Sequence, residues 1–162
     1  MNGYSIALLG IALCVLVCGI GSCLGLYKTS SIAAGVLGED PKKFGKVMVL
    51  VLLPATQGIY GFIIGIIASS ALPVGQAAQA AMTTAEGWAV FAATLPMTIS
   101  GVVSAFFQGR AAANCISAVA KQESLSGKLI VYPGMIEFYA ILGLIISIML
   151  SGAVGFTLPA VV

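Results

Sequence analysis

Three polar side chains that could bind a cation stand inside long apolar segments of the sequence. Glu137 follows Lys128 by nine residues, and Gln57 follows Lys46 by eleven. At the rise of a helix, these spacings place the two side chains roughly 13 Å and 16 Å beyond the basic residues. Gln108 lies at a comparable depth when counted back from the basic end of its own segment. If these segments are membrane helices, the three side chains converge on one level.

The residues around Gln57 add further oxygen atoms at this level. Leu53, Gln57 and Tyr60 share one helix face at spacings i, i+4 and i+7, and Thr56 stands beside them. Carboxylate, amide, hydroxyl and backbone oxygens are the ligands that hard cations prefer. Pro54 lacks an N–H group, which predicts that the Leu50 carbonyl loses its normal helical donor.

The predicted ligand set favours a monovalent metal ion. A proton needs only the carboxylate of Glu137, so the surplus of oxygen atoms indicates a larger cation. One monovalent ion neutralises one carboxylate, whereas a divalent ion would leave net positive charge in the lipid. We therefore predict Na⁺, with H⁺ as the alternative. For Thr56, Gln57 and Gln108, hydrogen bonding between helices without any ligand is the competing interpretation.

Composition excludes a water-soluble globule. Of the 162 residues, 60% are hydrophobic and 7% are charged, whereas soluble domains carry about 25% charged residues. Seven basic residues against five acidic ones are too few for a nucleic-acid surface. The sequence contains no P-loop, so we do not expect this chain to hydrolyse ATP or to be an enzyme.

The distribution of charge predicts an integral, multi-pass membrane protein with four helices. Apolar stretches are each long enough to cross a bilayer, and Glu137 is the one charge after residue 129. Thr83 with Glu86 fits a capping box at a helix start. The first apolar stretch precedes its basic residue, unlike a cleaved signal peptide. The predicted helices cover approximately residues 4–37, 44–70, 84–120 and 127–154.

Every basic residue flanks one of two links between these helices. The residues are Lys28, Lys42, Lys43 and Lys46 at the first link, and Arg110, Lys121 and Lys128 at the second. The positive-inside rule places both links in the cytoplasm, with both termini and the 71–83 link outside. The turn at residues 39–43 is a predicted docking surface for a cytoplasmic partner.

The two halves of the chain match without gaps at an offset of 82 residues, as from Gly19 to Gly101 and from Lys28 to Arg110. We interpret them as two tandem parallel hairpins, residues 1–75 and 84–162. Because both hairpins carry positive charge at their links, they differ from the inverted repeats of many secondary transporters. The counterpart of Glu137 is Ala55.

Small residues mark the first and third helices as a closely packed inner layer, with the second and fourth outside. Gly21 and Gly25 form a GxxxG spacing that lets helices approach closely in lipid. The cysteines lack CxxC spacing and are predicted to be small interface residues rather than ligands or disulfides. They are Cys14, Cys18, Cys23 and Cys115.

The segments LPATQGIYGF, beginning at Leu53, and EFYAILG, beginning at Glu137, resemble the duplicated proteolipid rotor subunit of V-type ATPases. The resemblance covers nearly the whole chain, and it is specific to the bacterial sodium-transporting branch, subunit K. It implies that Na⁺ is held by Glu137, Gln57, Gln108, Thr56 and the backbone carbonyl of Leu53. It also implies that Tyr60 hydrogen-bonds Glu137.

The same resemblance implies a homo-oligomeric ring in the bacterial plasma membrane. The ring would turn against a stator membrane subunit that carries an arginine, and the cytoplasmic links would contact a central-stalk subunit. From the residues alone two other classes stay open. One is a small, dimeric, ion-coupled exporter; the other is a structural membrane spacer.

Overall fold

The computed structural model describes residues 2–155, and within this range every regular element is helical. The first hairpin contains α1 (Gly3–Glu39), the 3₁₀ turn η1 (Pro41–Lys43), α2 (Phe44–Leu52), the 3₁₀ turn η2 (Leu53–Ala55) and α3 (Thr56–Ser70). The second contains α5 (Thr84–Lys121), the 3₁₀ turn η3 (Glu123–Leu125), α6 (Ser126–Leu129) and α7 (Val131–Gly155). The short α4 (Gln76–Ala81) lies between them.

The predicted helical membrane fold is confirmed. Four segments are long and apolar enough to cross a bilayer: Gly3–Glu39, Pro41–Ser70, Thr84–Lys121 and Glu123–Val154. They agree with the predicted helices within a few residues, because charged and turn residues set the ends of each apolar stretch. Residue 1, at the start of the first predicted hairpin, lies outside the described range. Residues 156–162, at the end of the second, also lie outside it.

The link between the hairpins, residues 71–83, is partly helical. Gly75, immediately before α4, has a φ of +96°, a left-handed conformation that glycine adopts without strain. The following Gln–Ala–Ala–Gln–Ala–Ala sequence forms α4, because alanine and glutamine have high helix propensity. The predicted capping box of α5 is confirmed, since the Thr83 side chain accepts from Glu86 N and Glu86 Oε2 accepts from Thr83 N.

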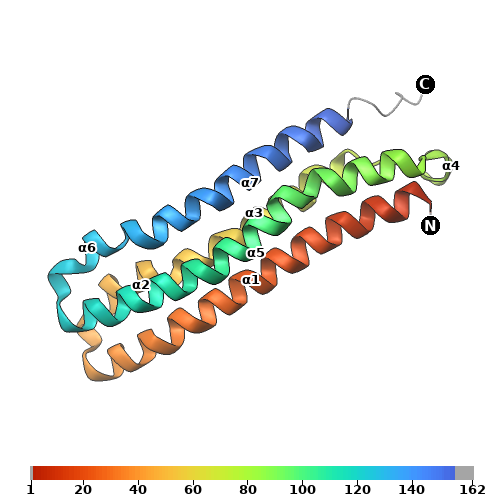
Figure 1. Ribbon diagram of the computed structural model, residues 1–162. Coiled ribbons are helices and arrows are strands. Elements are labelled where there is room, and N and C mark those ends of the chain that lie inside the picture. Colours follow the sequence, from red (N-terminus) through yellow and green to blue (C-terminus); the bar gives the residue numbers. More distant parts are fainter. Residues whose placement is uncertain (1, 156–162) are drawn as a thin grey trace.

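The two longest helices pack against each other along their length, and α5 lies between α1 and α7 (Figure 1). One of their close approaches is at Gly25 and Gly109, where a Cβ atom on Gly109 would lie 2.5 Å from the Cα of Gly25. Glycine allows this approach because it has no side chain. The broken helix α2–α3 packs on both α1 and α5, and α7 packs on α5 and α3.

The two hairpins repeat the same internal packing. A Cβ atom on Gly61 of α3 would lie 2.5 Å from the Cβ of Cys18 on α1. At the positions 82 residues later, Gly143 of α7 faces Ser100 of α5 in the same way. The duplicated pattern in the sequence therefore corresponds to a duplicated arrangement of helix pairs.

Both short links lie at one end of the bundle, opposite α4 (Figure 1), as expected for parallel hairpins. Lys46 forms an ion pair with Glu123, and Lys43 Nζ donates to the Ala120 carbonyl at 2.8 Å. These contacts connect the two links directly.

Of the four cysteines, all of which are unpaired thiols, three are buried between helices as predicted. The fourth, Cys23, is exposed on α1 in the single chain, so it does not contribute to an interface within it.

Candidate ion-binding site

The candidate site is built around the carboxylate of Glu137, which α7 holds against α3 and α5. Three side chains donate hydrogen bonds to it. Thr56 Oγ1 lies 2.7 Å and 2.8 Å from the two carboxylate oxygens. Gln57 Nε2 and Gln108 Nε2 lie 2.9 Å and 2.8 Å from Oε2. The structure therefore brings together four of the residues that the sequence singled out, from three different helices.

The two glutamines are fully buried, each with 0% exposure. Gln57 Nε2 also donates to Gln108 Oε1 at 2.6 Å, and Gln108 Nε2 donates to the Pro133 carbonyl at 3.0 Å. In contrast, Gln57 Oε1 is buried without a hydrogen-bond partner. Buried polar atoms are nearly always partnered. The site therefore holds an oxygen atom with unused capacity to accept a donor or a cation.

The backbone break at Pro54 places the carbonyl of Leu53 beside the Thr56 hydroxyl. The helix tightens into the 3₁₀ turn η2, in which the Leu53 carbonyl accepts from the backbone N–H of Thr56. The Thr56 hydroxyl lies 2.9 Å from the same carbonyl. The expectation that Pro54 leaves the Leu50 carbonyl without a donor stays a prediction; what the structure adds is that the chain tightens into a 3₁₀ turn after residue 52.

Ser22 on α1 supports this break from the side. Its hydroxyl accepts a hydrogen bond from the backbone N–H of Gly58 at 2.7 Å. Because Gly58 has no side chain, α1 and α3 can come close enough for this contact, with the Ser22 Oγ only 3.1 Å from where a Cβ would stand. The first helix thereby fixes the backbone that carries Thr56 and Gln57.

Tyr60 lies one turn further along α3, close enough to interact with both Glu137 and Thr56. Its ring packs beside the buried cluster that contains Cys18 and Met97. The phenol is therefore placed at the rim of the site, between the carboxylate and the hydrophobic core.

The Pro133 carbonyl is a member of the site that sequence reasoning missed. The spacing in the sequence could have indicated it, because Pro133 precedes Glu137 by four residues and therefore shares a face of α7 with it. The carbonyl holds the amide of Gln108 in place.

No basic side chain neutralises Glu137 within the described range. The ion pairs found in residues 2–155 are Lys43 with Asp40 and Lys46 with Glu123, both at the links. The same range contains no cluster of three or more His, Cys, Asp or Glu residues. A single carboxylate inside an apolar bundle is unfavourable when charged, and it is stabilised when a proton or a monovalent cation neutralises it.

A family model that describes the C subunit of ATP synthase matches residues 9–68 and again residues 91–150. The chain belongs to this ATP synthase C-subunit family. Both ends of the two matched segments are separated by 82 residues, the offset that the sequence predicted for its repeat. This member of the C-subunit family is therefore a tandem duplication of the family's helical hairpin.

Three relatives support this membership. A V-type sodium ATPase subunit K from Enterococcus hirae is 36% identical over 149 residues, which is 92% of each chain. An A-type ATP synthase subunit K from Methanocaldococcus jannaschii is 40% identical over 87% of this C-subunit family member and 59% of that protein. The c'' subunit of a V-type proton ATPase from Saccharomyces cerevisiae is 28% identical over 92% of this chain and 71% of that protein.

Proposed function

We propose that this protein is the ion-carrying rotor-ring subunit of a V-type ATPase, and that it transports Na⁺. The observation that carries the proposal is the site itself. One membrane-embedded carboxylate is surrounded by Thr56, Gln57 and Gln108, and one buried amide oxygen lacks a partner. The similarity to a sodium ATPase subunit over 92% of the chain supports the same ion.

The oxygen atoms at the site fit a sodium ion. Glu137, Thr56, Gln57 and Gln108 each supply a side-chain oxygen, and Leu53 supplies a backbone carbonyl. A proton on Glu137 would leave the Gln57 oxygen unsatisfied, whereas a cation held between the amide and the carboxylate would satisfy both. Tyr60 would then donate to Glu137 and restrict escape of the ion.

A proton is the second candidate cargo, because the relative from Saccharomyces cerevisiae is a subunit of a proton ATPase. Both cargoes use the carboxylate of Glu137. They differ in whether the amide oxygens matter, so the glutamines provide the test that separates them.

The mechanism follows from the cost of charge in lipid. An ionised, empty Glu137 facing the bilayer is strongly disfavoured, so only neutralised sites rotate through it. Each site would release its ion beside an arginine of the stator membrane subunit and reload from the other side. ATP hydrolysis would occur on other subunits, so this chain would not itself be an enzyme.

The orientation follows from the distribution of basic residues. The links, joined through Lys46 and Glu123, would face the cytoplasm and contact the central stalk. Both termini would lie outside the plasma membrane of a bacterium.

Carbodiimide labelling of Glu137 tests the ion directly. A carbodiimide reacts with a protonated carboxyl group, so bound Na⁺ should slow labelling at constant pH and constant ionic strength, whereas K⁺ should not. Gln57→Ala should raise the Na⁺ concentration needed for half-protection by about tenfold, as expected for loss of one ligand or charge-assisted hydrogen bond.

Gln76→Ala, in the exposed first turn of α4, is the matched control and should keep the protection of the unmodified protein. Protection that depends on pH alone, and that Gln57→Ala does not alter, would show that the cargo is a proton. Sizing of the purified protein in mild detergent distinguishes a ring from the dimer expected of a small exporter.

A further inference from the structure

A second hydroxyl on α1 contacts the broken helix, on the other side of the break from Ser22. Thr29 is fully buried, and its Oγ1 lies 3.0 Å from the carbonyl oxygen of Val51. Val51 belongs to the last turn of α2, which ends at Leu52. The last four carbonyls of an α-helix have no N–H partner within that helix. The Thr29 hydroxyl is therefore a donor for a carbonyl at the end of α2.

The same hydroxyl also lies near two carbonyls of its own helix, 3.0 Å from that of Leu26 and 3.3 Å from that of Gly25. Both residues lie well inside α1, where a carbonyl accepts the backbone N–H group four residues later. The carbonyl of Val51, at the end of α2, has no such partner within its helix. Since a threonine hydroxyl has a single proton to donate, the contact with Val51 gains the most from it.

Ser22, Gly25 and Thr29 form one face of α1 that follows the break closely. Their spacing, i, i+3 and i+7, places them on the same side of the helix. Ser22 accepts a hydrogen bond from the N–H group of Gly58, after the break. A Cβ atom on Gly25 would lie 2.5 Å from the Cβ of Pro54, within the break. This face therefore contacts the chain before, at and after the break.

Three of the predicted ligands lie between the two hydrogen-bonded positions, Val51 and Gly58. They are the backbone carbonyl of Leu53 and the side chains of Thr56 and Gln57. A short segment that is held at both ends has fewer conformations available to it. The face on α1 is thus placed where it can fix the positions of these three ligands relative to Glu137.

The second hairpin provides an internal comparison, because its outer helix is not broken at this level. The counterparts of Ser22, Gly25 and Thr29 are Ser104, Phe107 and Ala111. The counterpart of η2 is residues 135–137, which lie inside the continuous helix α7. Ala111 has no hydroxyl, and Ser104 bonds the Gly101 carbonyl of its own helix at 3.1 Å. Where the outer helix is continuous, these two positions of the inner helix do not bond it.

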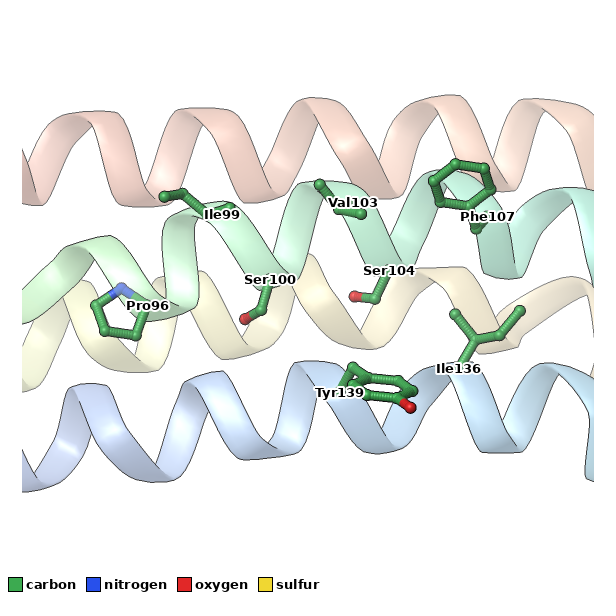
Figure 2. A pocket seen from close by; sticks show the side chains of 8 residues that line it. All are labelled: Pro96, Ile99, Ser100, Val103, Ser104, Phe107, Ile136 and Tyr139. Atoms are coloured by element: carbon green, nitrogen blue, oxygen red, sulfur yellow. The ribbon is translucent and has the colours of Figure 1, made fainter.

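Packing differs between the hairpins in the same way. Ser104 and Phe107 of α5 and Ile136 of α7, the counterpart of Pro54, line a groove of about 620 Å³ (Figure 2). At the matching positions of the first hairpin, Gly25 and Pro54 are packed directly against each other. The two hydrogen bonds, the close packing and the helix break therefore occur together in one hairpin and are missing at the matching positions of the other.

We propose that Thr29 is a positioning residue for Na⁺ binding. It acts through the Val51 carbonyl on the turn that carries Leu53 and Thr56, and it does not touch the ion itself. Hydrogen bonds behind the ligands of a metal ion hold these ligands in place, and the loss of one lowers metal affinity by about 10–100-fold. This inference rests on the proposed function, because it assigns a role toward the same ion.

The experiment is Thr29→Val, which removes the hydroxyl and keeps the shape of the side chain. The Na⁺ concentration for half-protection of Glu137 from carbodiimide, at constant pH and ionic strength, should rise about tenfold. Thr29→Ser should restore the unmodified value, because it restores the hydroxyl. Thr29→Ala, which copies Ala111 of the second hairpin, should behave like Thr29→Val and excludes an effect of the added methyl group.

Thr94→Val is the matched control. Thr94 is also buried, at 1% exposure, and its Oγ1 lies 3.2 Å from the carbonyl of Gly10 on α1. Gly10 precedes Ser22 by twelve residues, which is roughly 18 Å along the helix. This variant therefore removes the same kind of contact between helices, remote from the break. It should lower the midpoint of thermal unfolding and leave half-protection by Na⁺ unchanged.

Hydrogen–deuterium exchange provides a second measurement that needs no bound ion. Amide groups exchange through local opening of the structure. Peptides that cover residues 50–58 should take up deuterium faster in Thr29→Val than in the unmodified protein. The same peptides of Thr94→Val should match the unmodified protein.

The outcomes separate this role from the proposed function. Unchanged half-protection in Thr29→Val would overturn the inference and leave the function standing, and faster exchange in that case would assign Thr29 to stability alone. An equal rise in half-protection for Thr29→Val and Thr94→Val would also overturn it, because general loosening would then be the cause. Absence of Na⁺ protection in the unmodified protein would instead refute the choice of cargo, and with it any role of Thr29 in Na⁺ binding.

Discussion

Thr56 and Glu137 belong to different hairpins, yet one hydroxyl joins them. Thr56 Oγ1 lies 2.7 Å and 2.8 Å from the two oxygens of Glu137 and 2.9 Å from the carbonyl of Leu53. A hydroxyl has a single proton to donate and two lone pairs to accept with. The Thr56 oxygen is therefore placed where it can bond the empty carboxylate and, in the loaded site, face the ion.

Thr56→Val removes this hydroxyl while keeping the shape of the side chain. We expect the Na⁺ concentration for half-protection of Glu137 from carbodiimide to rise about tenfold, equivalent to about 1.4 kcal/mol, as for one hydrogen bond to a charged group. Thr56→Ser should restore binding because it restores the hydroxyl. Unchanged protection in Thr56→Val would exclude Thr56 as a ligand.

Glu137→Gln replaces the carboxylate with a neutral amide of nearly the same size. Rings of this variant should assemble, since an uncharged side chain is cheaper to bury. ATP-driven ²²Na⁺ uptake by vesicles containing the whole ATPase should fall to the level of vesicles without it. Transport that survives the substitution would support the structural spacer instead.

Gly109→Ala places a methyl group 2.5 Å from the Cα of Gly25, where α1 and α5 pack backbone against backbone. Because backbone cannot move aside as a side chain can, we expect a loss of at least about 1–3 kcal/mol, typical of overpacking. Gly35→Ala is the control, since no atom lies within 4 Å of its Cβ position. The midpoint of thermal unfolding in detergent should fall for the first variant and stay level or rise for the second.

Lys46→Ala breaks the ion pair between the two links. Both side chains are almost half-exposed, at 47% and 41%, so we expect a loss below about 1 kcal/mol. Choline chloride should weaken the pair in the unmodified protein and so reduce the difference between the two proteins. A loss of several kcal/mol, unaffected by salt, would show that the links stabilise the bundle in another way.

Much of the architecture could be predicted from the placement of charge. The charge-free stretches determine the four spans, and the basic residues mark the link ends, because burying a charge in lipid is far more costly than burying any apolar side chain. The capping box at Thr83 and the internal repeat could also be predicted, because each depends only on a fixed spacing of residues along the sequence. These features need no knowledge of how the helices are rotated against one another.

What the sequence could not provide was the rotation and local distortion of each helix. Apolar side chains cover nearly all sides of these helices, so periodicity does not distinguish the packed face from the lipid face. The Leu53 carbonyl depends on the 3₁₀ turn around Pro54, and the bond from Gln108 to the Pro133 carbonyl depends on how α5 meets α7. Both arise from packing between helices.

The absence of a second acidic residue in the first hairpin has a consequence for energy conversion. Ala55, in η2, occupies the position in the first hairpin that Glu137 occupies in the second. A ring of these chains would thus move one ion for every four helices in its circumference. Fewer ions per revolution mean fewer ions moved for each ATP hydrolysed. Each ATP could then drive its ions against a steeper gradient.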